Sequence, residues 1–151
     1  MAEVRVLGID PGAVSAAWGL ISPESGYSCG DVPVADGMVD ANGFADLVVK
    51  SAVTVAVIEK VNAFPKQGVS SSFRFGLGTG LIHGVIAALG FRRIEVAATV
   101  WKKHHHLNSD KEAARALALK RFPAVAQHLR NKKDAGRAEA LLIALWWLEQ
   151  R

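Results

Sequence analysis

Two short apolar runs, each followed at once by an acidic residue, constrain the fold of this chain most strongly. Residues 4–9 contain β-branched residues and end at Asp10-Pro11-Gly12, and residues 53–58 read Val-Thr-Val-Ala-Val-Ile before Glu59. Apolar runs of this length with turn residues after them are typical of buried β-strands. The chain is therefore predicted to contain a sheet in which two strands end in carboxylates.

The rest of the pattern predicts helices around a mixed sheet. After the first strand we expect a second, antiparallel strand at 13–21, a third strand at 29–34, the buried strand at 53–58 and a strand at 94–97. The expected helices lie at 42–51, capped by Asn42, at 69–89, buried on most sides, and at 110–122, with Ser109 as the N-cap. A final helix follows, which Asp134 can cap. This order predicts one α/β domain over residues 1–151, with three antiparallel strands followed by parallel strands.

Composition narrows the classes of protein. The 151 residues include one cysteine, Cys29, so an internal disulfide and a cysteine zinc cluster are both excluded. There is no run of about eighteen apolar residues, and the first residues lack the pattern of a signal peptide. We therefore expect no membrane span and a cytoplasmic location.

The charge is divided unevenly along the chain. Residues 1–99 hold seven Lys/Arg and nine Asp/Glu, net −2, whereas residues 100–151 hold eleven and five, net +6, which together give the total of +4. A basic half joined to a mildly acidic half suggests a polyanion such as nucleic acid as the partner. A solvated helical surface is the alternative.

The acids themselves suggest a chemistry. Asp10 and Glu59 each follow a strand, and Asp134 and Glu139 open an apolar helix. If the two strands are neighbours, carboxylates about 4 Å apart repel by about 4 kcal/mol at an effective dielectric constant near 20, so either one is protonated or a cation lies between them. Clusters of carboxylate oxygens select Mg²⁺ or Mn²⁺, and paired ions of this kind hydrolyse phosphodiesters.

Each acid also has a purely structural alternative. Asp10 can bond its own backbone in the turn, Glu59 can pair with Lys60 or Arg93, Asp134 can be a plain helix cap, and Glu139 can pair with Arg137.

In order, the segments Leu7-Gly8-Ile9-Asp10-Pro11-Gly12, Val57-Ile58-Glu59-Lys60-Val61 and Ala138-Glu139-Ala140-Leu141-Leu142 resemble the RuvC-type Holliday junction resolvases, most closely their phage-borne and poxvirus members. The resemblance implies a ribonuclease-H-like fold, a homodimer in a bacterial or phage-infected cytoplasm, and cleavage of two opposed strands of a four-way DNA junction with two Mg²⁺ or Mn²⁺ ions per active site. It implies that Asp10 and Glu59 bind metal and that Glu139 is the late acid of the final helix.

One departure from the family pattern concerns the fourth acid. The family usually has an acid or histidine about one turn before the late acid, but Gly136 and Ala135 occupy those positions here. Asp134 lies five residues before Glu139, about 140° around a helix. We expect it to reach the metals from the start of the helix; the alternative is that it only caps the helix.

The resemblance also assigns basic residues. Lys102 and Lys111 match the positions of two active-site lysines, where an ammonium group offsets charge developing on the cleaved phosphate. The alternative for both is phosphate binding alone. Phe64 is a candidate to insert between bases, although the aligned position is Asn62. The expected DNA-binding residues are Lys60, Phe64, Lys66, Arg74, Lys103, Arg115, Lys132, Lys133 and Arg137.

Two further features have competing interpretations. His104-His105-His106 is disfavoured as a metal site because successive residues ligate one ion poorly and no acid is nearby in the sequence, so a DNA-facing loop is expected. Gly76, Gly80, Gly84 and Ala88 form a ridge of small residues in the long helix, at a cost of about 0.5–1 kcal/mol per glycine. We expect this ridge to form the dimer contact; the alternative is close packing on the chain's own sheet.

Three functions remain in competition at this point. A metal-dependent junction endonuclease is favoured. The second is a module that binds branched DNA with weak or lost cleavage, or a less specific nuclease of branched and flap DNA. The third, half of an actin-like kinase or ATPase, needs a second domain and a second phosphate loop that 151 residues do not supply.

Overall fold

A five-stranded mixed sheet forms the centre of the molecule in this computed structural model, which describes residues 2–12, 15–63 and 65–151. Its strand order is β3-β2-β1-β6-β7. The strands are β1 (Val6–Asp10), β2 (Ala17–Ser22), β3 (Gly26–Asp31), β6 (Val55–Lys60) and β7 (Arg92–Ala97), and a separate hairpin joins β4 (Val34–Ala35) and β5 (Met38–Val39). The strands β1, β2 and β3 are antiparallel, while β1, β6 and β7 are parallel, which confirms the predicted mixed sheet.

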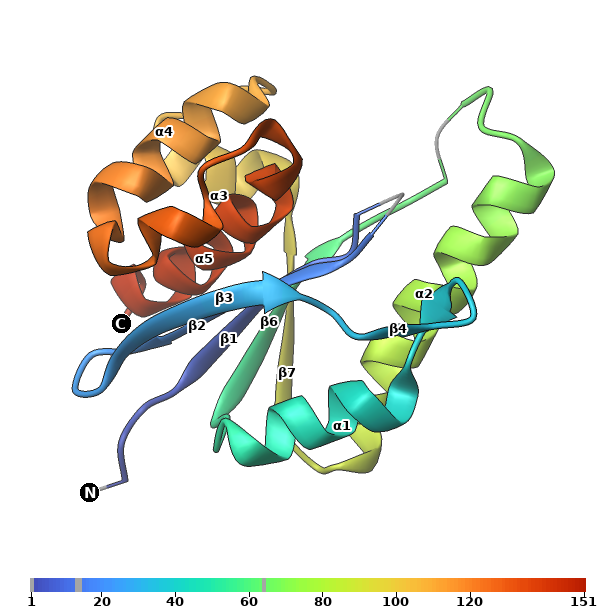
Figure 1. The fold of residues 1–151 in the computed structure, drawn as a ribbon, viewed down its shortest axis with the longest axis horizontal. Helices are drawn as coiled ribbons and strands as arrows, with labels where there is room; N and C mark the ends of the chain where they lie inside the picture. Colours follow the sequence, from blue (N-terminus) through green and yellow to red (C-terminus); the bar gives the residue numbers. More distant parts are fainter. Residues whose placement is uncertain (1, 13–14, 64) are drawn as a thin grey trace.

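Helices cover both faces of this sheet, as Figure 1 shows. The helices are α1 (Ala41–Lys50), α2 (Val69–Ala88), α3 (Ala98–His104), α4 (Lys111–Arg121) and α5 (Ala135–Glu149), with the 3₁₀ turns η1 (Pro123–His128) and η2 (Lys132–Asp134) before α5. α1 and α2 lie on one face, and α3, α4 and α5 lie on the other. None of the helices in the described part of the chain is both long and apolar enough to cross a membrane.

Alternation along the strands creates two cores. Val6 packs with the side chains of α4 and α5, whereas its neighbour Leu7 packs with those of α1 and α2. Successive side chains of a strand point to opposite faces, so a fully apolar strand needs cover on both sides. β1 is buried along its whole length, and this central position explains why the first apolar run contains no polar residue on either face after Arg5 until Asp10.

Two paired glycines let α5 approach the sheet closely. Gly8 of β1 and Gly19 of β2 are register partners beneath α5. A Cβ at Gly8 would collide with the carbonyl oxygen of Ala140 and lie 2.7 Å from the nitrogen of Ala144, and one at Gly19 would lie 2.5 Å from the nitrogen of Leu141. The missing side chains therefore set the depth at which α5, and the acid it carries, sits against β1.

The structure corrects several predicted details. Asp40, not Asn42, caps α1 by accepting a hydrogen bond from the nitrogen of Gly43, and Asp110, not Ser109, caps α4 by accepting one from the nitrogen of Glu112. The cap of α1 lies two residues before the predicted one and the cap of α4 one residue after it, and aspartate is as favourable an N-cap as asparagine or serine.

The long helix α2 is not buried on most sides. Its buried residues are Gly78, Ile82 and Ile86, while Val69 and Phe73 are 89% and 69% exposed. The apolar composition suggested burial within one chain, but only one stripe of the helix contacts the sheet and α1.

Candidate active site

The parallel pairing of β1 with β6 places Asp10 and Glu59 side by side. Ile9 and Ile58 are register partners, so each acid comes next after a paired residue at the same edge of the sheet. Adjacent strands lie about 4.8 Å apart. Asp10 is only 6% exposed, and its Oδ1 accepts a hydrogen bond from the nitrogen of Gly12 at 3.2 Å. The turn bond foreseen as the structural alternative for Asp10 is thus present, but it occupies only one side of a buried carboxylate.

The third acid comes from α5. Glu139 is 3% exposed, and its Oε1 lies 3.3 Å from the Nζ of Lys111, the first residue of α4. A Cβ at Gly136, one turn earlier, would lie 3.4 Å from Asp10 Oδ2, at ordinary van der Waals distance. Glu139 therefore pairs with Lys111, not with Arg137, and the start of α5 lies directly against Asp10.

The charges of these acids act on one another. Burial, followed by the charges of Glu139 and Glu59, raises the pKa of Asp10 to about 7. Burial and the charge of Glu139 also raise the pKa of Glu59, against the opposing hydrogen bond from Trp101. Burial tends to lower the pKa of the Lys111 ammonium, but its attraction to Glu139, Asp10 and Glu59 outweighs this and raises it. Three acids from distant parts of the chain therefore form one electrostatically coupled cluster with one close ammonium group.

Trp101 holds Glu59 in place, a contact that sequence reasoning missed. The fully buried indole of Trp101, in α3, donates a hydrogen bond from Nε1 to Glu59 Oε2 at 2.7 Å. Lys102 follows it, with Nζ 5.4 Å from the centre of the Trp101 ring, and its charge lowers the pKa of Glu59. The sequence showed a tryptophan beside Lys102, but no spacing rule connects residue 101 with residue 59.

Asp134 has different partners from the other acids. It is buried, its Oδ2 accepts a hydrogen bond from the nitrogen of Asn131 at 2.9 Å, and its Oδ1 lies 3.6 Å from Arg137 Nη1. Its side chain makes no capping bond to α5 and instead belongs to a capping box with Asn131 at η2. The structure thus brings Asp10, Glu59 and Glu139 together, whereas the carboxylate of Asp134 interacts with Asn131 and Arg137.

Two of the expected DNA-binding arginines are engaged inside the protein. Arg115 donates to Glu112 and to the carbonyl oxygens of Leu129 and Arg130. Arg137 makes two 3.0 Å hydrogen bonds to the carboxylate of Asp31. Both side chains therefore fasten the segment before α5.

The other expected basic residues lie at the surface. Arg74 is exposed and donates to the carbonyl oxygen of Gly37 at 2.8 Å. Phe64 lies outside the described residues. The remaining members of the set are exposed lysines: Lys60, Lys66, Lys103, Lys132 and Lys133.

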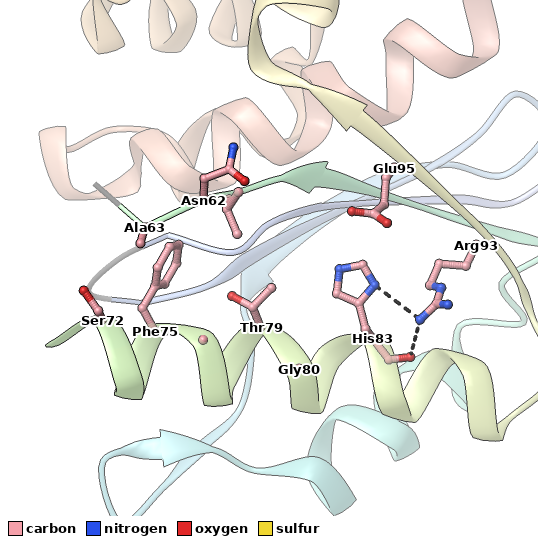
Figure 2. A pocket seen from close by; sticks show the side chains of 11 residues that line it. Asn62, Ala63, Ser72, Phe75, Thr79, Gly80, His83, Arg93 and Glu95 are labelled. Atoms are coloured by element: carbon pink, nitrogen blue, oxygen red, sulfur yellow. Dashed lines mark hydrogen bonds between the residues drawn. The ribbon is translucent and has the colours of Figure 1, made fainter. Parts of the chain in front are cut away.

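A cleft of about 480 Å³ between α2, β7 and the segment that follows β6 is separate from the acids (Figure 2). Thr79 and His83 project into it from α2, and Arg93 donates to both the ring Nδ1 and the carbonyl oxygen of His83. Asn62, from the segment after Glu59, lines its other end. Arg93 thus pairs with His83 and not with Glu59, and the three clustered acids do not line this cleft.

The three consecutive histidines have different environments. His104 ends α3, and its Nε2 lies 3.6 Å from Glu149 Oε1 at the end of α5. His105 is buried, with Nε2 2.8 Å from the carbonyl oxygen of Leu142, and burial lowers its pKa. Only His106 is exposed. The expected DNA-facing loop is wrong for His105, which is buried, and folding brings an acid that is distant in the sequence, Glu149, close to His104.

Comparison with known proteins adds sequence relatives and a matching fold. No family model matches the chain. It is 34% identical over 93 residues to the chloroplastic Holliday junction resolvase MOC1 of Chlamydomonas reinhardtii, covering 60% of this chain and 10% of that protein. It is 30% identical over 112 residues to the crossover junction endodeoxyribonuclease RuvC of Nitratidesulfovibrio vulgaris, covering 68% of this chain and 66% of that protein.

The fold comparison agrees with these relatives. Thermus thermophilus RuvC, solved in complex with a Holliday junction substrate, matches with a TM-score of 0.69 at 13% identity, covering 97% of this chain and 96% of that one. The matched region spans slightly less than two thirds of the bacterial relative and a tenth of the algal one. Neither relative is a phage or poxvirus protein, so closeness to those members stays a prediction. The predicted ribonuclease-H-like fold is confirmed, and the chain is similar in sequence to Holliday junction resolvases of the RuvC type.

Proposed function

We propose that this protein is a metal-dependent endodeoxyribonuclease that resolves four-way DNA junctions, with residues 1–151 forming one nuclease domain. The observation that carries the proposal is the cluster of Asp10, Glu59 and Glu139, which come from β1, β6 and α5; burial and the charges of the neighbouring acids raise the pKa values of Asp10 and Glu59. Such an arrangement lowers the stability of the metal-free fold, because buried like charges repel. Clustered acids that lower the stability of the fold in this way are typical of a functional site.

The cluster fits divalent ions. Three carboxylates face one close ammonium group, that of Lys111, so the set keeps a net negative charge when ionised. Its donors are all oxygens, which suits Mg²⁺ or Mn²⁺. We propose that Asp10, Glu59 and Glu139 hold two such ions. When bound, the ions supply an activated water and stabilise the leaving oxygen. Asp134 would join them only after release from Asn131 and Arg137.

The other residues around the cluster have separate proposed roles. Trp101 fixes one oxygen of Glu59 and leaves the other free for an ion. Lys111 and Lys102 place ammonium groups where charge develops on the cleaved phosphate. We propose that the exposed lysines bind phosphates flanking the junction; these are Lys60, Lys66, Lys103, Lys132 and Lys133. Arg115 and Arg137 support this surface from within through their internal hydrogen bonds.

We propose that two copies associate through α2. A Cβ at Gly76, Gly80 or Gly84 would meet nothing within 4 Å, so this ridge does not pack on the chain's own sheet. The neighbouring apolar residues Val69 and Phe73 are 89% and 69% exposed. A second copy would cover this apolar face, and a two-fold axis would set two active sites against opposite strands of a symmetric junction.

The proposal is tested with a labelled four-way junction. The purified protein should make symmetric nicks with Mg²⁺ or Mn²⁺ and none with EDTA, while Asp10→Asn should keep binding and lose cleavage. Cleavage by Asp10→Asn at the wild-type rate would remove Asp10 from the site. Forks and flaps assayed in parallel distinguish a junction enzyme from a less specific nuclease.

One observation favours a second candidate, a module that binds branched DNA without cutting it. Asp134 is held by Asn131 and Arg137, which leaves three acids in the cluster where the family pattern expects four. Tight junction binding with no cleavage in either metal would establish this candidate over the nuclease. A cytoplasmic location in a bacterium or a phage-infected cell is part of the proposal, since such a protein needs access to DNA.

A further inference from the structure

A second group of metal-ligating side chains lies at the opposite end of α5 from Glu139. It consists of His104, His105 and Glu149, and one potential ligand atom from each residue lies within 4.8 Å of the other two. His104 ends α3, His105 follows it, and Glu149 ends α5. Ten residues of helix, or about 15 Å, separate Glu149 from Glu139 along α5, so the two groups are distinct.

The hydrogen bond of His105 fixes which of its nitrogens can bind an ion. A carbonyl oxygen only accepts, so the Nε2 of His105, 2.8 Å from the oxygen of Leu142, carries the proton. In neutral imidazole the other nitrogen, Nδ1, then has the free lone pair. Histidine ligands of metals commonly donate their second N–H to a backbone carbonyl in this way, which fixes both tautomer and ring orientation.

The spacing of the other two ligands suits a tetrahedral ion. Ligands about 2.1 Å from a tetrahedral Zn²⁺ lie about 3.4 Å apart, and His104 Nε2 lies 3.6 Å from Glu149 Oε1. The amide Nε2 of Gln150 donates to the carbonyl oxygen of Trp146 and lies 3.3 Å from His104 Nδ1. For His104 Nε2 to bind an ion, Nδ1 has to carry the proton, so the Gln150 amide would have to turn away from it. The ion would then occupy the position between His104 and Glu149.

One competing cation must move aside. Arg121 Nη2 lies 3.8 Å from Glu149 Oε1. The Arg121 side chain is 43% exposed, so it can withdraw into solvent while Glu149 turns toward the histidines. The three ligand atoms, which now lie within 4.8 Å of one another, would also have to close to the roughly 3.4 Å that a tetrahedral ion requires.

We propose that His104, His105 and Glu149 form a binding site for a transition-metal ion that prefers imidazole, of which Zn²⁺ is the representative, with water completing its coordination. Two histidines and one carboxylate form a known zinc ligand set, and Mg²⁺ has little affinity for imidazole nitrogen. The ion would join the end of α5 to the end of α3, the helix that carries Trp101. This proposal does not rest on the nuclease function.

The test is calorimetric titration of the full chain with Zn²⁺ in excess Mg²⁺, which keeps the carboxylate cluster occupied. We expect one Zn²⁺ per chain, with binding at least about 100-fold weaker in both His104→Ala and Glu149→Gln, since losing a direct ligand costs more than the roughly 10- to 100-fold typical of an outer partner. Both residues are partly exposed at a helix end, so these variants should fold, which circular dichroism verifies.

His106→Ala is the matched control. His106 is exposed, adjacent in the sequence and outside the group, so its loss should leave Zn²⁺ binding unchanged. Three results would overturn the proposal. They are absence of Zn²⁺ binding by the wild-type chain, binding as tight as wild type in both His104→Ala and Glu149→Gln, and a loss of binding in His106→Ala as large as in those variants. Because Mg²⁺-dependent junction cleavage is measured separately, failure of this site and failure of the nuclease proposal are distinguishable.

Discussion

Replacing Asp10 with asparagine should make the metal-free protein more stable. Asp10 is 6% exposed, and burial together with the charges of Glu139 and Glu59 raises its pKa from an ordinary 3.8 to about 7 in the folded state. At about 1.36 kcal/mol per pH unit, that difference amounts to about 4 kcal/mol lost from the free energy of unfolding above pH 7. Asparagine carries no charge, and its carbonyl oxygen can still accept the hydrogen bond from Gly12.

The sign of the pH dependence follows from the same values. The folded state holds the Asp10 proton more tightly than the unfolded state, so its stability falls as the pH rises from about 4 to about 7 and is then level. The free energy of unfolding of Asp10→Asn should therefore exceed that of wild type by up to about 4 kcal/mol at pH 8 and by close to zero at pH 4. Urea unfolding in EDTA, followed by tryptophan fluorescence, measures both differences.

The control variant is Asp46→Asn, which changes an exposed acid on α1 and should leave stability nearly unchanged at both pH values. Saturating Mg²⁺ should remove much of the advantage of Asp10→Asn, because an ion at 100 times its Kd stabilises the wild type by about 2.7 kcal/mol. Equal or lower stability of Asp10→Asn at pH 8 in EDTA would refute the claim that Asp10 is a repelled, buried carboxylate.

Four other outcomes follow from the same geometry. Trp101→Phe removes the donor to Glu59 Oε2, which should raise the pKa of Glu59 further and move the acidic limb of the cleavage pH profile up by about one unit; an unmoved limb contradicts a positioning role. Gly8→Ala forces a Cβ into α5 and should lower the urea unfolding free energy by about 3 kcal/mol or more, so a neutral result means that α5 does not pack there. Phe73→Asp should raise the dimer Kd at least tenfold in sedimentation equilibrium, and an unchanged Kd places the dimer contact elsewhere. Lys132→Ala should reduce the salt-dependence slope of junction binding by about 0.9, and an identical slope excludes a phosphate contact there.

The central sheet and the placement of two acids were predictable from local pattern. An apolar run that needs cover on both faces predicts a central strand, and parallel neighbours end at the same edge, so Asp10 and Glu59 had to meet once β1 paired with β6. Glu139 was foreseen through the family resemblance, but its electrostatic effect on Asp10 depends on how closely α5 packs on Gly8 and Gly19, which only the three-dimensional structure reveals.

Other parts of the site depend on contacts between residues far apart in the sequence. The hydrogen bond from Trp101 to Glu59, and the approach of Glu149 to His104, join residues 42 and 45 positions apart, respectively. The partners of Asp134 are close in sequence, but a capping box at a 3₁₀ turn competes with the simpler cap of α5, and local pattern does not decide between them. The exposure of α2 was mispredicted for a different reason, since apolar composition does not say which molecule covers a face.

The close seat of α5 on Gly8 and Gly19 has a consequence for how the protein is made. A ribosome that has released β1 and β6 but still encloses α5 presents Asp10 and Glu59 without Glu139, and it leaves the glycine strip of the sheet open to water. The set of Asp10, Glu59 and Glu139 is therefore complete only after α5 has docked on the sheet. Under the proposed nuclease function, a copy that still lacks α5 would be without the finished carboxylate centre.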